Sequence, residues 1–429
     1  MTPIAVTPMQ AISPTAALAK DHAKWIRPGV VFYLRCLALA CLGLTMTGCI
    51  SQTIKSTSVP SLEAPATPIP ESERLDVAVA IFDPGIDFAE EDERLYPEVR
   101  RAEARYIPKL LAGVLQNSGA WGAVRVVPNE ERITDLMISG TILHSDGETL
   151  ELKIVAQDSR GYVWLDRSYE GQASRYAYDS KTRSSYDPFQ AVYHHIANDL
   201  IRLFDELPTA QRKEIRTVSE LLFAQSFSAE AFAGYLDKTR KGKQLVIRLP
   251  ADDDPMLARV RSLRERDHVF VDTLQTYYNG FSDEMFGPYQ EWRKLSYEEV
   301  VAYQELKRES TRQLIAGGVA IIAGIAASGS NDRSARTAGT VGIIGGGYLL
   351  KSGLESRAEA QIHVEALEEI GQSLEAEITP QVIELEDRTV MISGSVEDQY
   401  AQWREVLAEI YRNEIGDLAA PAPDNRTQN

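Results

Sequence analysis

"DLMISGTILHSDGETLELKIVAQDSRGYVWLDRSYEG" (residues 135–171) contains three apolar segments of eight or nine residues, separated by two polar turns. In the middle segment Leu150, Leu152, Ile154 and Ala156 alternate with polar residues. Alternation of this kind is typical of an antiparallel strand that buries one face. The turns Ser-Asp-Gly and Asp-Ser-Arg-Gly join neighbouring segments. We therefore expect a three-stranded antiparallel meander over this stretch.

The residues before the meander predict the rest of a small domain. Leu75–Asp83 is a short β-branched and apolar run, which predicts a buried strand. Apolar residues within 107–115 recur at i, i+3, i+4, i+7 and i+8, which is one face of a helix that ends at Gly119. Val124–Val127 predicts a second strand, and the next seven residues leave room for only about one helical turn. We expect an α/β domain over residues 74–172.

The meander, together with the opening strand VAVAIFDPG (77–85), resembles a segment shared by three groups of bacterial envelope proteins. These are TolB-like N-terminal domains, curli-secretion lipoproteins and lipoprotein activators of penicillin-binding proteins. Their common pattern is a strand ending in Ser/Gly-Gly-Thr, a meander, an Asp-x-x-x-Gly turn and a last strand with a Trp, here Trp164. The chain departs from the pattern at 128–134, where these families have a second helix. The resemblance implies a docking module without catalytic residues, sometimes oligomeric.

The first 48 residues predict an export signal. Four basic residues precede a short apolar run that ends in small residues, and the run is too short for a spanning helix of ~20 residues. Its end, Met46-Thr47-Gly48-Cys49, resembles the lipobox of bacterial lipoproteins, although Met46 replaces the usual Leu. The resemblance implies recognition of Met46, Thr47 and Gly48, cleavage before Cys49 and acylation of Cys49. Ile50 follows where Asp would favour inner-membrane retention, so we expect the outer membrane. The alternative is an ordinary signal peptide with an incidental cysteine.

The composition of the residues after position 48 limits the functions that the mature chain could have. All three cysteines lie at or before position 49, which excludes a disulfide framework in the remainder. Residues 49–73 are rich in proline and serine and predict a tether. The net charge is −17, and it becomes −20 without residues 1–48. That acidity opposes nucleic-acid binding, which needs clustered Lys and Arg.

The region 185–313 has helical periodicity and is expected to be mainly helical. Asp252-Asp253-Asp254-Pro255 predicts a helix start, with Asp254 as the cap and Pro255 in the first turn. A calcium site is the alternative, but the run lacks the spaced oxygen ligands of an EF-hand loop.

Residues 314–353 predict a Gly-rich helical hairpin that resembles glycine-zipper segments. Each arm of about 14 residues reaches ~21 Å against a hydrocarbon core of ~30 Å. A simple two-span hairpin is therefore too short, unless its ends extend or the membrane thins. The alternatives are partial insertion, association with other copies, and burial in a soluble core. Small residues recur at four-residue spacing, which lets helices approach closely. The stripes are Ala316, Ala320, Gly324 and Ser328 in the first arm, and Ala338, Gly342 and Gly346 in the second.

The C-terminal part predicts a helix, a β-hairpin and a second helix over 354–417, followed by a disordered tail, 418–429. Ser395 to Asp398 resembles a capping box at the start of the second helix. The fold class expected for the whole chain is α+β: strand-helix-strand plus an antiparallel meander, a mainly helical region with the Gly-rich hairpin, and this C-terminal unit.

The sequence contains no G-x-S-x-G, Walker A, H-E-x-x-H or C-x-x-C motif. Its histidines after position 49 are more typical of packed or surface side chains than of metal ligands. They are His144, His194, His195, His268 and His363. We expect a non-catalytic outer-membrane lipoprotein without cofactor or metal, whose partners are an envelope protein and a second copy of itself. The alternatives are a component of an outer-membrane secretion complex and a cell-wall-acting enzyme.

Overall fold

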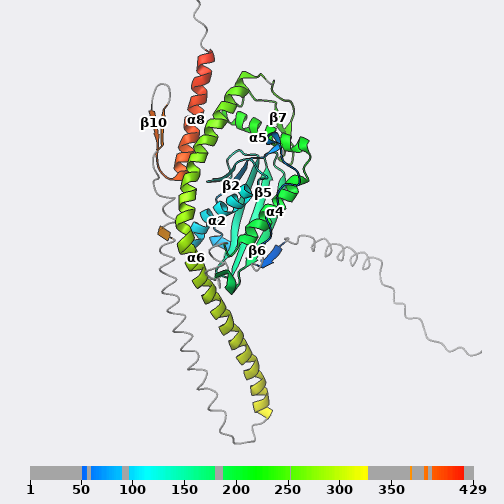
Figure 1. Cartoon of the computed structure of the whole chain (residues 1–429), viewed down its shortest axis with the longest axis vertical. Helices are drawn as coiled ribbons and strands as arrows, with labels where there is room; N and C mark the ends of the chain where they lie inside the picture. The colour runs from blue at the N-terminus through cyan, green and yellow to red at the C-terminus, as the bar shows by residue number, and fades with distance from the viewer. Residues whose placement is uncertain are drawn as a thin grey trace, which may run out of the picture. The chain divides into compact units, whose positions relative to one another are not determined.

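The computed structural model has a mixed α and β fold, which confirms the expected fold class at that level (Figure 1). Signal peptide, lipobox, second hairpin arm and C-terminal tail beyond residue 419 lie outside the residues that it describes. The described residues are 51–55, 59–88, 96–178, 187–251, 253–326, 368–369, 381–384 and 389–419.

A six-stranded sheet is the centre of the fold, with strand order β1-β6-β5-β4-β2-β3. The antiparallel strands β4, β5 and β6 are the predicted meander, while β2 runs parallel to both β3 and β4, and β1 runs parallel to β6. The strands are β1 (Ser51–Lys55), β2 (Val77–Ala80), β3 (Val124–Val127), β4 (Leu136–Ser145), β5 (Thr149–Asp158) and β6 (Val163–Gln172).

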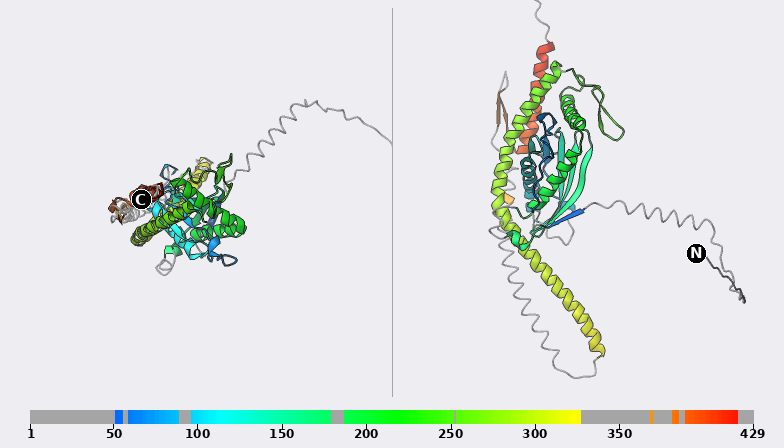
Figure 2. Two further views of the ribbon diagram at one scale, coloured as in Figure 1. Left: turned by 90° about the horizontal axis from the view of Figure 1, so that it is seen from above. Right: turned by 45° about the vertical axis from the view of Figure 1, so that its right-hand side comes forward.

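Two helices cover one face of this sheet. Helix α2 (Pro97–Asn117) connects β2 to β3, and α4 (Gln190–Asp205) follows β6 (Figure 2). The alternating apolar residues of β5 are fully buried on this side, as the sequence pattern requires. Gly119 has φ +68°, a left-handed conformation that suits glycine just after the end of α2.

The segment that we expected to be a free tether is attached to the fold. Residues 51–55 form β1, and residues 59–73 contact α4 and the helix after it. The Asn198 side-chain oxygen accepts a hydrogen bond from the Glu63 amide at 2.9 Å, and its nitrogen donates to the Ser61 carbonyl at 3.0 Å. The tether prediction is wrong here because polar side chains of α4 satisfy the proline-rich main chain, which makes an extended backbone stable without a strand partner.

The described part of the region 185–313 contains α4, α5 (Thr209–Phe227), a short β-hairpin and most of α6 (Pro255–Ala326). Helix α5 is followed by the hairpin of β7 (Leu236–Lys238) and β8 (Gln244–Val246). Helix α6 then runs along the β3 edge of the sheet (Figures 1 and 2). Asp254 caps it as predicted, because its Oδ1 accepts the Met256 amide at 2.8 Å.

Helix α6 is 72 residues long and includes the described part of the first predicted hairpin arm, so this arm begins as the end of a longer helix. Within the described ranges, no helix has a stretch long and apolar enough to cross a membrane.

The C-terminal unit has the predicted hairpin and helix. Strands β9 (Gln381–Glu384) and β10 (Thr389–Ile392) are antiparallel, and α8 (Val396–Ala419) follows. The capping box is present, since Ser395 Oγ accepts the Asp398 amide at 3.1 Å and Asp398 Oδ2 accepts the Ser395 amide at 3.1 Å. Helix α8 packs on α6, where the ring of Trp403 stacks on Phe270 at 4.7 Å. The described residues also include three short 3₁₀ helices: η1 (Glu71–Glu73), η2 (Ile86–Phe88) and η3 (Arg175–Tyr178).

Candidate functional site

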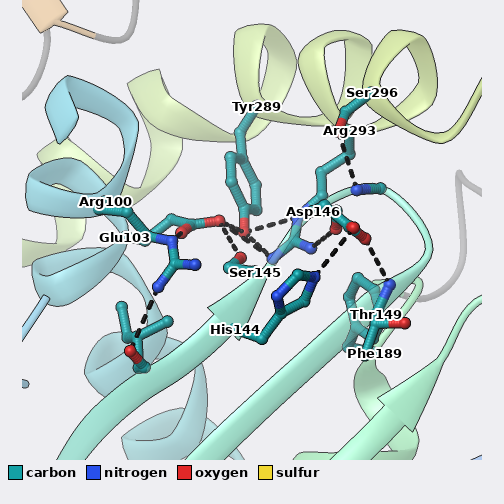
Figure 3. Close-up of polar contacts among 12 residues, drawn as sticks. Arg100, Glu103, His144, Ser145, Asp146, Thr149, Phe189, Tyr289, Arg293 and Ser296 are labelled. Carbon is teal, nitrogen blue, oxygen red and sulfur yellow. Dashed lines mark hydrogen bonds and ion pairs between the residues drawn. The ribbon is translucent and has the colours of Figure 1, made fainter. Parts of the chain in front are cut away.

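A buried ion pair joins α6 to the α/β domain (Figure 3). Glu103 of α2 and Arg293 of α6 have side chains that are 0 % and 1 % exposed, and Glu103 Oε1 lies 3.1 Å from Arg293 Nη2. The pair forms because Glu103 occupies the apolar face of α2, between Ala102 and Tyr106, where no water reaches the carboxylate.

Other polar groups form hydrogen bonds to the same oxygen of Glu103, whereas Oε2 is buried without a hydrogen-bond donor among the described residues. The same Oε1 accepts hydrogen bonds from Ser145 Oγ at 2.6 Å and from the Tyr289 hydroxyl at 2.7 Å. Arg293 Nε donates to the Tyr289 hydroxyl at 2.7 Å, and Arg293 Nη1 donates to the Asp146 carbonyl. Figure 3 shows that these side chains converge from α2, the β4–β5 turn and α6. We call Glu103, Ser145, Tyr289 and Arg293 the closed cluster.

A second arginine supports the closed cluster from α2. Arg100 lies one turn before Glu103, and its Nε is 3.8 Å from Glu103 Oε2. Its Nη1 donates to the Ile142 carbonyl at 3.2 Å, so the guanidinium also holds β4. The Arg100 side chain is 2 % exposed. Two buried cations therefore share one carboxylate.

Asp187, just before α4, adds a further buried carboxyl group near Arg293. Its oxygens accept hydrogen bonds from the Phe189 amide at 2.8 Å and from Gln290 Nε2 at 3.1 Å. Burial raises the pKa of Asp187, and the Arg293 charge opposes that rise. Burial lowers the pKa of Arg293, but Tyr289, Glu103 and Asp187 outweigh it, so the pKa is raised and the guanidinium stays charged.

The β4–β5 turn is held against α6 by main-chain contacts. The Gly147 amide donates to Ser296 Oγ at 3.0 Å. A Cβ at Gly147 would lie closer than 3.0 Å to the Arg293 carbonyl and the Tyr297 amide, so only glycine permits this approach. Asp146 Oδ1 accepts the amides of Glu148 and Thr149 at 2.7 and 2.6 Å, which closes the turn.

His144 and Asp146 form a partly exposed pair in the same turn, with His144 Nε2 2.9 Å from Asp146 Oδ2. Burial raises the pKa of Asp146, but the hydrogen bond and charge of His144 and the two amides outweigh it and lower the pKa. Ser145 is bonded to Glu103 rather than to His144.

A second set of ion pairs joins the first part of α6 to the sheet, and we call it the open cluster. Its pairs are Arg132–Asp267 at 2.9 Å, Arg264–Asp135 at 3.6 Å and Arg125–Asp272 at 2.6 Å. Asp272 is 54 % exposed, in contrast to every charged group of the closed cluster. A cavity of about 370 Å³ borders the open cluster, lined in part by Arg132, Asp267, Tyr400 and Arg404.

His268 of α6 lies beside the open cluster, close to three arginines. Burial and the charges of Arg125, Arg132 and Arg264 lower the pKa of His268 to about 4, while Asp76 opposes the shift. The imidazole is therefore neutral at pH 7.

Gln275 of α6 closes the edge of β3. Its Oε1 accepts the Val126 amide at 2.9 Å, and its Nε2 donates to the Val126 carbonyl at 2.9 Å. The carboxamide thus takes the place of a peptide group in a neighbouring strand.

A second large cavity, of about 500 Å³, lies where α6 passes η3. It is lined in part by Arg175, Tyr178, Lys294 and Tyr297. The Tyr178 and Tyr297 rings are 5.2 Å apart, and the Tyr178 hydroxyl donates to the Gly147 carbonyl. This cavity is therefore next to the closed cluster but does not include Glu103 or Arg293 among its lining residues.

The structure places part of the predicted small-residue stripe. Ala316, Ala320 and Gly324 lie on α6 at successive turns. Ser328, Ala338, Gly342 and Gly346 lie outside the described residues, as do Met46, Thr47, Gly48 and Cys49. His194 Nδ1 is 2.7 Å from the Pro60 carbonyl, His195 lies on the same helix, and His363 is not described. Across the described ranges, no group of three or more His, Cys, Asp or Glu is arranged to hold a metal.

Sequence reasoning missed the closed cluster. Its signal is present in the chain: Glu103 has helical spacing to Val99 and Ile107, so a charged residue occupies the apolar face of a helix. Tyr289 and Arg293 are likewise one turn apart. A charge at an apolar helix position needs a buried partner, but the sequence does not say which residue supplies it.

Comparisons of the chain with protein-family models, with curated proteins and with solved structures gave no match.

Proposed function

We propose that the chain is a non-catalytic outer-membrane lipoprotein that acts as a docking or assembly module of the bacterial envelope. Cys49 carries the lipid after removal of residues 1–48. The TolB-like α/β domain, 74–172, docks an envelope protein. Residues 314–353 form the Gly-rich hairpin, which inserts partly into a membrane or associates with other copies.

The observation that carries the proposal is the attachment of α6. The open and closed clusters join it to the sheet at residues 264–275 and 289–296, and the helix then continues to Ala326. Residues 305–326 add ~33 Å of helix at 1.5 Å per residue. The small-residue stripe lies on this last part, where close packing against another helix is possible. A fixed helix therefore links the docking domain to the proposed assembly segment.

The first experiment tests the anchor. Labelling cells with a fatty acid that carries a clickable group is expected to label the wild-type protein and not Cys49→Ala. Cys49→Ala is also expected to remain unprocessed or to leave the membrane fraction. Equal labelling of the two proteins would contradict the lipoprotein assignment.

The second experiment tests the fixed link between domain and stripe. A seven-residue helical insert after Arg308 preserves the helix and nearly preserves its facing, because two turns span ~7 residues. A seven-residue Gly/Ser insert at the same place breaks the helix. We expect in-cell crosslinks between copies to survive the helical insert and to decrease at least about tenfold with the flexible insert. Equal crosslinking of both would contradict a role for a rigid α6.

The third experiment tests the stripe itself. Gly324→Leu places a large side chain on the stripe. Gly318→Leu places the same side chain about 160° around the helix from Ala320, the middle of the described stripe. We expect Gly324→Leu to abolish the crosslinks and Gly318→Leu to leave them, since only the first blocks close packing. Loss in both variants, or in neither, would contradict assembly through this face.

A further inference from the structure

The β7–β8 hairpin presents apolar side chains to solvent. Leu245, Ile247 and Leu249 are 47 %, 55 % and 66 % exposed. Leu245 lies in β8, and Ile247 and Leu249 follow the strand at two-residue spacing. Tyr162, at the β5–β6 turn, is 50 % exposed. Lys243 connects the two parts, because its Nζ lies 4.9 Å from the centre of the Tyr162 ring.

The same hairpin is strongly basic in an acidic protein. Residues 236–248 hold five basic residues and one acidic residue, Asp237, which pairs with Leu245 across the hairpin, while the chain as a whole has a net charge of −17. Lys238, Arg240, Lys241 and Arg248 are exposed, and Lys243 is half-buried. Exposed aliphatic side chains among Lys and Arg are typical of surfaces that bind anionic membranes.

The hairpin is held in place by the sheet. The Gln244 amide donates to the Arg160 carbonyl at 2.9 Å, and the Lys243 ammonium donates to the Gly161 carbonyl. Arg160 is itself fixed by ion pairs to Asp158 at 2.8 Å and Glu214 at 3.0 Å. The apolar and basic face is therefore preformed.

The position of β1 brings the expected anchor close to this edge of the sheet. Only Ile50 separates Cys49 from β1, and Ser51 pairs with Ser168 of β6. Strand β6 begins at Val163, five residues before Ser168, which is ~17 Å at ~3.3 Å per residue. With no spacer, a lipid on Cys49 holds the β1 and β6 edge next to the membrane. This step rests on the proposed lipoprotein function.

We propose that the β7–β8 hairpin and Tyr162 dock on an anionic phospholipid surface. Leu245, Ile247 and Leu249 enter the headgroup region, and the basic side chains around them contact lipid phosphates. The hairpin is then a second membrane contact besides the acyl chains, and it orients the domain on the bilayer.

The experiment places an environment-sensitive dye on the full-length protein through Leu245→Cys. The matched control is Met391→Cys on β10, because Met391 is 65 % exposed and lies outside the hairpin. Unsubstituted protein, labelled in the same way, gives the background from any native cysteine that remains reactive. Each sample is mixed with phosphatidylcholine vesicles that contain or lack phosphatidylglycerol.

We expect a blue shift of the dye at position 245 with phosphatidylglycerol vesicles and none at position 391. Adding Arg240→Glu and Lys241→Glu is expected to weaken the 245 response at least about tenfold, as is high salt. A dye at 245 that does not respond to anionic vesicles overturns the proposal, and so does an equal response from neutral vesicles. Capture of an acidic protein by the hairpin without any vesicle response overturns it in favour of a protein partner.

Mass spectrometry of the same samples separates this inference from the proposed function. An acylated Cys49 with a silent dye at 245 overturns the hairpin inference alone. An unmodified Cys49 with a responding dye overturns the lipoprotein assignment and supports the lipid-binding hairpin.

Discussion

The closed and open clusters both join α6 to the sheet, but they differ in their access to water. Glu103 and Arg293 are at most 1 % exposed, and their polar contacts come from three elements of the chain. In the open cluster Asp272 is 54 % exposed, and a cavity of about 370 Å³ adjoins the Arg132–Asp267 pair. The closed cluster therefore fixes the position of α6, and breaking it is expected to cost much stability. The open cluster is accessible to water, which is able to solvate a group that loses its partner.

The largest effect is expected in the closed cluster. Glu103→Ala leaves Arg293 buried without its carboxylate, which should lower the free energy of unfolding by about 3–5 kcal/mol. Urea unfolding at pH 7 measures this loss. The double variant Glu103→Leu with Arg293→Met should be more stable than Glu103→Ala, because it removes both charges. A double variant that is less stable would refute this account of the pair.

A smaller loss is expected from Asp267→Asn in the open cluster. Arg132 keeps a hydrogen bond to the Tyr400 hydroxyl at 3.3 Å, and water in the adjoining cavity is able to solvate it. We expect a loss of about 1–3 kcal/mol in the free energy of unfolding, with faster amide exchange in α8. The exposed pair offers the control: Asp272→Asn should cost less than about 1 kcal/mol. Equal losses in the two variants would mean that burial does not separate these pairs.

His268 should make stability depend on pH. Its pKa is about 4 in the folded protein and near 6.5 when unfolded, so the unfolded chain binds more protons between these values. Above about pH 6.5 the imidazole is neutral in both states, and His268 does not lower the free energy of unfolding. As the pH falls from about 6.5 toward 4, protonation of His268 in the unfolded chain lowers the free energy of unfolding. Between pH 7 and pH 5 the wild type should lose about 1–2 kcal/mol more than His268→Gln. Parallel urea titrations of both proteins at the two pH values provide the measurement, and identical pH dependence would contradict the shift.

The smallest effect is expected at the β3 edge. Gln275→Ala removes two hydrogen bonds to Val126. Their loss should lower the free energy of unfolding by about 1 kcal/mol. Its more specific consequence is faster exchange of the Val126 amide, which loses its acceptor. The Val79 amide, in the middle of the sheet, should exchange as in the wild type. Unchanged exchange at Val126 would show that the carboxamide does not protect the edge.

The sequence predicted the elements of the α/β domain because their periodicity is local. Strand β3 has the expected bounds, and the meander ends within three residues of the expected position. The attachment of residues 59–73 was not predictable, because it depends on Asn198 and other side chains more than a hundred residues away. The closed cluster was not predicted for the same reason, since Glu103 and Arg293 are 190 residues apart. Local patterns specify which segments are helices and strands, whereas buried polar partners are specified only by the assembled fold.

The close contact at Gly147 also affects the position of the far end of α6. The Arg125–Asp272 contact lies 24 residues before Ser296, and Ala326 lies 30 residues after it, which are ~36 Å and ~45 Å along α6. If α6 moves as one body about Asp272, a displacement of ~1 Å at the Gly147 contact becomes ~2 Å at Ala326. A methyl group added to one turn residue would thus misplace the far end of the helix by more than it displaces the near part. The small-residue stripe then depends on a glycine about 170 positions earlier in the chain.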